Sequence, residues 1–415
     1  MATNREFQDM LNEYLNEDLL REEFIPRTYV LKNIEKDDGW KGGKYVVPFR
    51  GAYASSVEYG QLTASNDVAS SKYVRGSVDA QIEIWGTMKF NSRDLMEHDK
   101  ISEQNFLRLL PDEIEDFMDY MKNVVSVNLL VGDHFAKLTA DSTANDGIIT
   151  VDRPDRFTAG QKVIVDDDNS APLTGYVSVI DINNFRVTLV TTRGGATPVD
   201  FSANQMTTAQ NARCYHPGAQ TSAFNSVRKA LLSAANGGSS ALYGQTKLAY
   251  PYLQAINIPG NDITAANILL KVFDALTRYR LLSKGNATEI WCSYKNFGAI
   301  VKAVESSKGA FNVVPDSRKT SVYNWQEVTI GSVTGGVIKF VGIQEADDDI
   351  IIFMDWRALK FASNGFFRKQ RSPDGLEYFV IRNQTGYEYL VDICLFGELI
   401  VTRPSYCGII FGISF

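Results

Sequence analysis

The clearest pattern along the chain is a strict alternation of apolar and polar positions that begins at Val78. Apolar or small side chains occupy every second position, namely Val78, Ala80, Ile82, Ile84, Gly86 and Met88. The positions between them carry mostly polar side chains, namely Asp79, Gln81, Glu83, Trp85, Thr87 and Lys89. A period of two is typical of a β-strand that buries one side. The segment is therefore predicted to be a strand.

A second β-patterned arm precedes this strand, starts at Tyr45 and reads YVVPFRGAYASSVEYG. The stretch from Gln61 to Lys72 is small, polar and without periodicity, which is typical of a loop. These features predict a long projecting hairpin in which residues 78–88 form the return arm. A two-stranded ribbon is marginally stable alone in water, and its unpaired edges favour association. We therefore expect the ribbon to lie on another subunit.

Two helices are predicted before residue 140. Thr3 and Glu6 form a capping box, and apolar residues at helical spacing follow it, so residues 1–35 should form an N-terminal arm. This arm could pack on its own domain or on a neighbouring subunit. A longer helix is predicted from Pro111 to Leu138, with the proline in the first turn. Unbroken, it would be roughly 42 Å long, well beyond the average globular helix.

Short strands replace the helical pattern after this point. They are predicted at residues 147–151, 162–165, 175–182 and 185–190, with Asp- and Asn-rich turns between them. Residues 145–210 are therefore predicted to form a small inserted all-β domain, similar to a barrel or sandwich. A linker with a helix should occupy residues 211–260.

The last part of the chain has an α/β pattern followed by a β-rich pattern. Segments with apolar residues at helical spacing alternate with strands such as EIWCS, which predicts an α/β domain at residues 261–348. Strand patterns at residues 377–382 and 387–401, separated by the turn NQTG, dominate residues 349–415. Together the patterns predict an α+β fold.

Composition limits the class of protein. The 415 residues are enough for two or three domains, and 44% hydrophobic with 22% charged residues is ordinary for a soluble globular protein. A formal charge of -7 argues against a general nucleic-acid binder, which needs clustered Lys and Arg. The four cysteines form no C-x-x-C pair, which favours a reducing compartment. The charged N-terminus and the lack of an 18-residue apolar window indicate a soluble intracellular product without a membrane partner.

Sequence signatures of catalysis are missing. The three histidines are not in metal-ligand spacing, and the P-loop, dinucleotide and G-x-S-x-G motifs are absent. The acidic triplets at residues 166–168 and 347–349 could hold calcium or magnesium, but solvated turns explain them with fewer assumptions. No catalytic, metal-binding or cofactor-binding residue is predicted. An α/β enzyme with an appended β binding module is the alternative, with Glu289, Glu305 and Asp316 as available carboxylates in no paired spacing.

Aromatic and charged residues around the predicted ribbon and in the C-terminal region are candidates for contacts between subunits. Aromatic side chains often anchor interfaces, and here they lack the interleaved cations of a base-stacking platform. The candidates are Trp40, Tyr45, Tyr53, Tyr59, Glu83, Trp85, Arg368, Lys369, Arg371 and Asp374. The charged ones of residues 368–374 could equally form a solvated turn.

The order of these elements resembles the Hong Kong 97-type major capsid proteins of tailed double-stranded DNA phages. The resemblance covers nearly the whole chain, up to the closing segment FGELIVTRPSYCGIIFGISF. It implies that residues 36–92 are the extended loop and that residues 93–144 carry the spine helix of the peripheral domain. It also implies that residues 261–348 are the axial domain and that residues 349–415 complete the peripheral domain. The β module at residues 145–210 resembles domains that some members carry on the outer surface.

The resemblance implies a structural function and no enzymatic one. Many copies would form the hexamers and pentamers of an icosahedral head that encloses packaged double-stranded DNA, made in the host cytoplasm. The implied partners are a separate scaffolding protein, a portal, a decoration or cement protein, and DNA through non-specific contact. The charged turn near Arg371 resembles the loop that meets its counterparts at local threefold axes. An encapsulin-like nanocompartment shares this fold and is the alternative.

Overall fold

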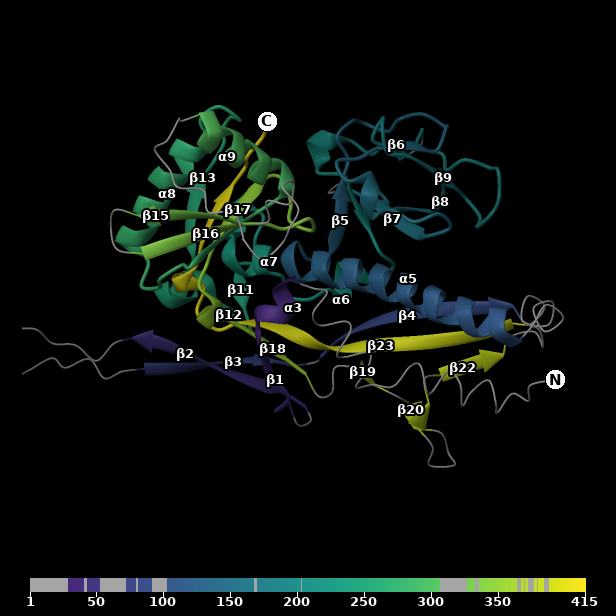
Figure 1. The fold of residues 1–415 in the computed structure, drawn as a ribbon, viewed down its shortest axis with the longest axis horizontal. Coiled ribbons are helices and arrows are strands. Elements are labelled where there is room, and N and C mark those ends of the chain that lie inside the picture. Colours follow the sequence, from purple (N-terminus) through teal and green to yellow (C-terminus); the bar gives the residue numbers. More distant parts are fainter. Residues whose placement is uncertain are drawn as a thin grey trace, which may run out of the picture. The chain divides into compact units, whose positions relative to one another are not determined.

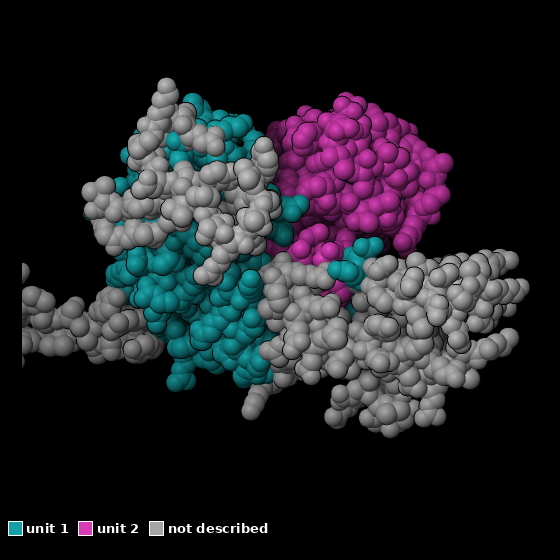
Figure 2. Space-filling model, viewed as in Figure 1, with its two compact units in different colours: residues 1–117, 227–415 teal, residues 118–226 magenta. Residues whose placement is uncertain are grey.

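The computed structural model describes residues 29–40, 43–52, 72–79, 81–91, 103–167, 170–202, 204–306, 327–332, 336–363, 367–368, 370–371, 377–378, 380–383 and 388–415. The predicted N-terminal helix and the predicted hairpin tip lie outside these residues. The described chain is a mixture of helices and sheets, which confirms the α+β fold class (Figure 1). It divides into two compact units, residues 1–117 with 227–415 and residues 118–226 (Figure 2).

The first unit contains a sheet built around one long strand, β23 (Glu388–Val401). Strand β4 (Ile82–Asn91) pairs with it antiparallel over ten residues. The other members are β1 (Glu35–Asp37), β18 (Leu359–Ala362), β19 (Phe367–Arg368) and β22 (Val380–Asn383). The alternation predicted for β4 is confirmed, because Gly86 and Met88 are buried while Glu83 and Trp85 are exposed.

The predicted return arm of the hairpin is wrong. Strand β2 (Tyr45–Ala52) pairs with β3 (Lys72–Val78), and the two form a separate two-stranded sheet, drawn in purple in Figure 1. The alternating segment belongs to β4 and pairs with β23. A periodic pattern tells which side of a strand is buried but not which strand lies beside it, so the pairing partner was not readable.

An α/β sheet forms the second core of this unit. Its strand order is β13 (Ile256–Pro259), β24 (Gly408–Phe411), β17 (Ile350–Met354), β14 (Glu289–Cys292), β16 (Gly336–Gly342) and β15 (Glu327–Ser332). Helices α8 (Ile268–Leu282) and α9 (Tyr294–Ser306) contribute to the same core cluster. Strand β17 is buried at all five positions, which is typical of a strand covered on both faces.

The predicted limits of this α/β domain, residues 261–348, are too narrow. Strand β13 precedes them, and β17 and β24 follow them, yet all three lie within the α/β sheet. The reason is that the chain leaves this sheet after β17, builds the sheet around β23, and then returns. Such a return depends on contacts between distant segments and leaves no mark in the local pattern.

The second unit contains a six-stranded sheet in the order β5 (His134–Lys137), β10 (Arg213–Tyr215), β7 (Lys162–Asp166), β8 (Leu173–Asp181), β9 (Arg186–Val190) and β6 (Ile148–Thr150). All four strands predicted in this region are present. The flanking strands β5 and β10 were not recognised because each is short and pairs with a segment distant in sequence. The sheet therefore extends beyond the predicted limits of 145–210 at both ends.

Helix α5 (Glu103–Leu130) has the predicted length but not the predicted position. It begins eight residues before Pro111 and ends before Gly132, which has a φ of 114°. A proline favours the first turn of a helix, and in the interior it removes one backbone hydrogen bond and clashes with the preceding turn, yet α5 contains Pro111 in its interior. The proline was therefore an unreliable marker of the start.

Short elements complete the fold. The helices are α3 (Tyr29–Asn33), α6 (Ala219–Ser222) and α7 (Val227–Leu231). The 3-10 turns are η1 (Pro154–Arg156), η2 (Thr208–Gln210), η3 (Ala234–Asn236), η4 (Lys247–Ala249), η5 (Pro251–Leu253), η6 (Trp356–Ala358) and η7 (Pro404–Tyr406). Two small hairpins pair β11 (Ala241–Leu242) with β12 (Gln245–Thr246), and β20 (Gln370–Arg371) with β21 (Glu377–Tyr378).

Candidate assembly site

The ribbon of β2 and β3 has one covered face and one open face. Val47 and Phe49 of β2 are buried, at 1% and 3% exposed, and lie on the same side as buried Gly76 of β3. On the other side, Val46 is 52% exposed, and Pro48 is exposed as well. The ribbon thus packs on its own chain through its inner face. Its outer face is an apolar surface open to solvent at Val46.

Tyr243, in the turn between β11 and β12, anchors the inner face. Its ring stacks on Phe49 with the centroids 5.8 Å apart and the planes at 7°. A Cβ atom at position 76 would lie 2.6 Å from Cε2 of Phe49 and 3.0 Å from Cβ of Tyr243, so only glycine fits between them. Tyr243 has a φ of 50°, a left-handed conformation that is uncommon for a residue with a side chain. The turn is therefore held in an unfavourable conformation by the packing around the ring.

The hydroxyl of Tyr243 connects this anchor to the long strand β23. It donates a hydrogen bond to the carbonyl of Leu399 (3.1 Å) and accepts one from the backbone N–H of Val401 (2.7 Å). Burial raises the pKa of Tyr243, so the hydroxyl stays protonated and can serve both roles. One side chain therefore links the root of the ribbon to the sheet around β23.

A second anchor lies at the base of β2. The hydroxyl of Tyr45 donates to Oδ2 of Asp37 (2.6 Å), and the rings of Trp40 and Tyr45 lie 5.3 Å apart. The hydrogen bond from Tyr45 and another from the N–H of Gly39 hold the pKa of Asp37 below its ordinary value. Trp40 is only 2% exposed and packs within its own chain, so its role as a contact between subunits stays a prediction. Tyr45 has the same intramolecular role but remains half-buried.

The other predicted contact residues fall into two groups. Glu83 and Trp85 are exposed on β4, where the indole N–H of Trp85 donates to Glu83 (3.2 Å) and its ring meets Phe396 edge-on. They remain available to a partner. The rest lie outside the residues whose side chains are described, namely Tyr53, Tyr59, Arg368, Lys369, Arg371 and Asp374.

The acidic triplet at residues 347–349 is not a solvated turn, as predicted, but half of an ion-pair cluster. Arg228 of α7 donates to Asp347 (2.7 Å) and with two nitrogens to Asp349 (both 2.8 Å). Burial disfavours the charge of Arg228, but the two carboxylates keep its pKa above the ordinary value. Asp347 and Asp349 are therefore engaged by a guanidinium of their own chain. This partner lies more than a hundred residues away, so the sequence pattern could not reveal it.

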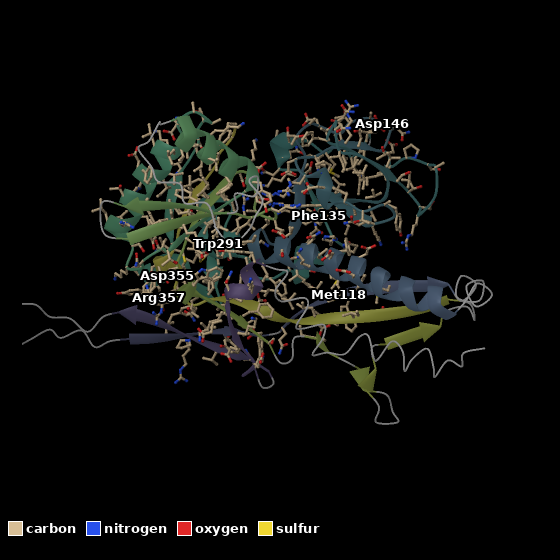
Figure 3. The ribbon with its side chains drawn as sticks, viewed as in Figure 1. Met118, Phe135, Asp146, Trp291, Asp355 and Arg357 are labelled. Carbon is tan, nitrogen blue, oxygen red and sulfur yellow. The ribbon has the colours of Figure 1, made fainter. Side chains whose placement is uncertain are left out.

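Two further polar contacts hold α7 and η6 in place. Lys247 is buried and donates through Nζ to the carbonyls of Lys229 and Leu232 (2.9 Å each), at the C-terminal end of α7. Burial lowers the pKa of Lys247 to about 8. Asp355 and Arg357 point toward one another, with an Nη2–Oδ2 distance of 2.6 Å (Figure 3). Burial alone would raise the pKa of Asp355, but this partner lowers it.

Glu289, a candidate carboxylate for an enzyme, is held by aromatic donors. Its Oε2 accepts hydrogen bonds from the hydroxyl of Tyr29 and from the indole N–H of Trp291, both at 2.9 Å. The rings of Trp291 and Trp356 lie 4.9 Å apart beside it. These contacts fix α3 to the α/β sheet, which is a structural role. Glu305 and Asp316 lie outside the residues whose side chains are described.

The described residues contain no group of three His, Cys, Asp or Glu side chains arranged to hold a metal ion. His134 and His216 are both in the second unit, and burial lowers the pKa of His216 to about 4. The four cysteines are buried free thiols. Across the described part of the chain, every helix is too short or too polar to span a membrane.

The chain is similar to solved capsid structures along nearly its whole length. It aligns with the Cyanophage A-1(L) capsid asymmetric unit over 94% of its own length and 93% of that chain, with a TM-score of 0.48 and 11% identity. It aligns with the satellite phage P4 procapsid that includes the size determination (Sid) protein over 99% and 98%, with a TM-score of 0.41 and 10% identity. For a virus-like particle from Pyrococcus furiosus, the values are 98%, 99%, 0.37 and 10%. The sequence matches no family model and no curated protein.

Proposed function

We propose that this chain is the major capsid protein of a tailed phage and assembles into the hexamers and pentamers of an icosahedral shell. The observation that carries the proposal is the β2–β3 ribbon, which is fixed at its root but has an exposed apolar outer face. A two-stranded ribbon gains little stability by itself, so its conformation needs a further surface. A neighbouring copy of the chain supplies that surface in the proposed shell.

The rest of the fold is consistent with a structural protein that bears load in a shell. Long elements, the 28-residue α5 and the 14-residue β23, provide stiff supports, and polar clusters such as Arg228 with Asp347 fix short connections to the sheets. The carboxylate of Glu289 accepts hydrogen bonds from aromatic side chains, and the four thiols are buried. Neither the carboxylate nor the thiols are therefore exposed as reactive groups. We therefore propose a structural protein and no enzymatic activity.

The proposed partners follow from assembly of such a shell. A separate scaffolding protein would guide closure, a portal would occupy one vertex, and a decoration protein could bind the outer surface. Packaged double-stranded DNA would touch the inner surface without sequence specificity, since a chain of charge -7 has a weak general attraction for phosphates. The shell would be made in the host cytoplasm and would be the head of the virion.

Electron microscopy of the expressed chain, alone and together with the products of neighbouring genes, tests the proposal. Hollow icosahedral particles are the expected result, and analytical ultracentrifugation would then show a sharp boundary far above the monomer. A protein that stays monomeric under all these conditions would contradict the proposal. The contents of particles purified from the native source decide between a genome container, which holds DNA, and a nanocompartment, which holds a protein cargo.

A further inference from the structure

We infer that the ribbon binds a second copy of the chain through its outer face, around Val46, and not by offering its edge for strand addition. This inference rests on the proposed function and specifies the mode of contact. Projecting ribbons can associate in both ways, because an unpaired strand edge is a template for another strand. The hydrogen bonds at the ribbon root distinguish the two.

The outer edge of β3 is already used within the chain. The N–H of Ser77 donates to the carbonyl of Tyr243 (3.1 Å), and the carbonyl of Arg75 accepts from the side chain of Gln245 (3.1 Å). Both backbone groups therefore point away from β2. Along this part of β3, a second strand from another chain would have to displace the turn that anchors the ribbon.

The outer edge of β2 is interrupted by Pro48. In an antiparallel pair, residues that face each other share one orientation, so when Ser77 and Arg75 point outward their partners on β2 do the same. Those partners are Val46 and Pro48. Proline has no N–H, so this edge lacks a donor at the centre of the described ribbon. Proline on an edge strand is a common device against unwanted strand pairing.

The outer face is the surface that remains. The inner face is covered by Tyr243, the edge of β3 is occupied, and the edge of β2 lacks a donor at Pro48. Val46 is 52% exposed on the outer face, opposite Ser77 and beside the exposed Pro48. The side chain of Lys44 at the same end of the ribbon pairs with Asp79 (3.0 Å).

Charge complementarity favours a second copy as the occupant. Arg75 places a cation on the outer face opposite Pro48, whereas the chain as a whole carries a charge of -7 and Asp116 of α5 is exposed. An apolar centre beside a cation therefore fits a surface of another copy that carries carboxylates. Complementary charges of this kind steer partners together and fix their register more than they add affinity.

Substitutions on the outer face test the mode of contact. Val46→Asp should lower the yield of assembled particles at least tenfold, because it buries a charge in the contact, whereas Val46→Thr should lower it only slightly. Val179→Asp is the matched control, since Val179 is equally exposed, at 57%, but lies on β8 in the other unit. Thermal unfolding of each unassembled variant checks that the subunit still folds.

Hydrogen exchange on assembled particles gives a second readout. Face-on contact predicts that the outward N–H of Val46 exchanges in particles within about tenfold of its rate in free subunits. Strand addition predicts strong protection of that N–H and normal assembly of Val46→Asp, and either result would overturn the inference while particles still form. If the unchanged protein forms no particles, the proposed function itself fails.

Discussion

Phe49 and Tyr243 stack with their rings nearly parallel, at a centroid separation of 5.8 Å, and this pair joins the ribbon to the rest of its subunit. Tyr243 is in turn hydrogen-bonded to both Leu399 and Val401 of β23. The direction of the ribbon is therefore set by a long strand that is buried along most of its length. A defined direction is what a projecting segment needs if every copy is to meet its neighbour in the same way.

Removal of the Tyr243 hydroxyl should weaken this link without removing the ring. Tyr243→Phe leaves the carbonyl of Leu399 and the N–H of Val401 without their partner, at an expected cost of about 1–3 kcal/mol in the free energy of unfolding. Urea denaturation of the subunit measures this cost. Tyr294→Phe is the matched control, because Tyr294 is 52% exposed and should change stability little. Equal effects of the two substitutions would contradict the role of Tyr243.

Gly76 should be intolerant of even the smallest side chain. Gly76→Ala places a methyl group against Phe49 and Tyr243, and overpacking of this kind costs about 1–3 kcal/mol. Gly298→Ala provides the comparison, since a Cβ there has open space in helix α9 and alanine favours a helix by about 0.5–1 kcal/mol. Calorimetry should therefore show opposite shifts of the melting temperature. A Gly76→Ala protein that melts at the normal temperature would refute the tight packing.

The Arg228 cluster should contribute far more to stability than an ion pair on the surface. Arg228→Met leaves two carboxylates without their cation, and the loss of one partner from a buried pair costs about 3–5 kcal/mol. Lys271→Met breaks the exposed pair with Asp262 and should change the stability little, because solvent screens a pair on the surface. Denaturant midpoints of the two variants measure the difference. Similar midpoints would show that water solvates Asp347 and Asp349 in place of Arg228 with little loss of stability, which would contradict the prediction.

Stability should fall as the pH rises above about 8.5, the ordinary pKa of a thiol. Burial raises the pKa of Cys214, Cys292 and Cys407, the last to about 12, so these thiols stay protonated in the fold. The unfolded chain releases their protons first, and the stability present below 8.5 is lost as the pH climbs toward the folded values. Lys247 has the opposite effect, because its folded pKa is lowered, but it is one group against three.

Urea midpoints at pH 7.5 and 9.5, measured with a reductant present, test this dependence. A lower midpoint at pH 9.5 is expected. A constant or higher midpoint would mean that the thiols are not held in their protonated form. Cys292→Ala should reduce the pH dependence, since one of the three thiols is then missing.

Local patterns predicted much of the secondary structure. The alternation from Ile82 to Met88 predicted the exposed and buried sides of β4, and the turn residues of the second unit marked four of its six strands. These features depend on neighbours along the chain, so a single sequence contains them. The same holds for the strand EIWCS and the helix after it.

The candidate site was predicted less completely, because its geometry depends on contacts between distant segments. Trp40 is of a residue type that is common at interfaces, but it is buried in its own chain. Tyr243 was not recognised in the sequence, because its role depends on contacts with Phe49 and with β23. The acidic triplet at residues 347–349 did not indicate that Arg228 is its partner. These residue types are common in proteins, and only their contacts in the folded chain show their roles.

A cryo-electron microscopy reconstruction of particles assembled from the purified chain tests the central claim most directly. The account predicts a closed shell in which residues 45–52 and 72–78 of each copy lie on a neighbouring copy, with Val46 buried in the contact. A shell whose ribbons touch no neighbour, or a chain that forms no particle at all, would contradict it.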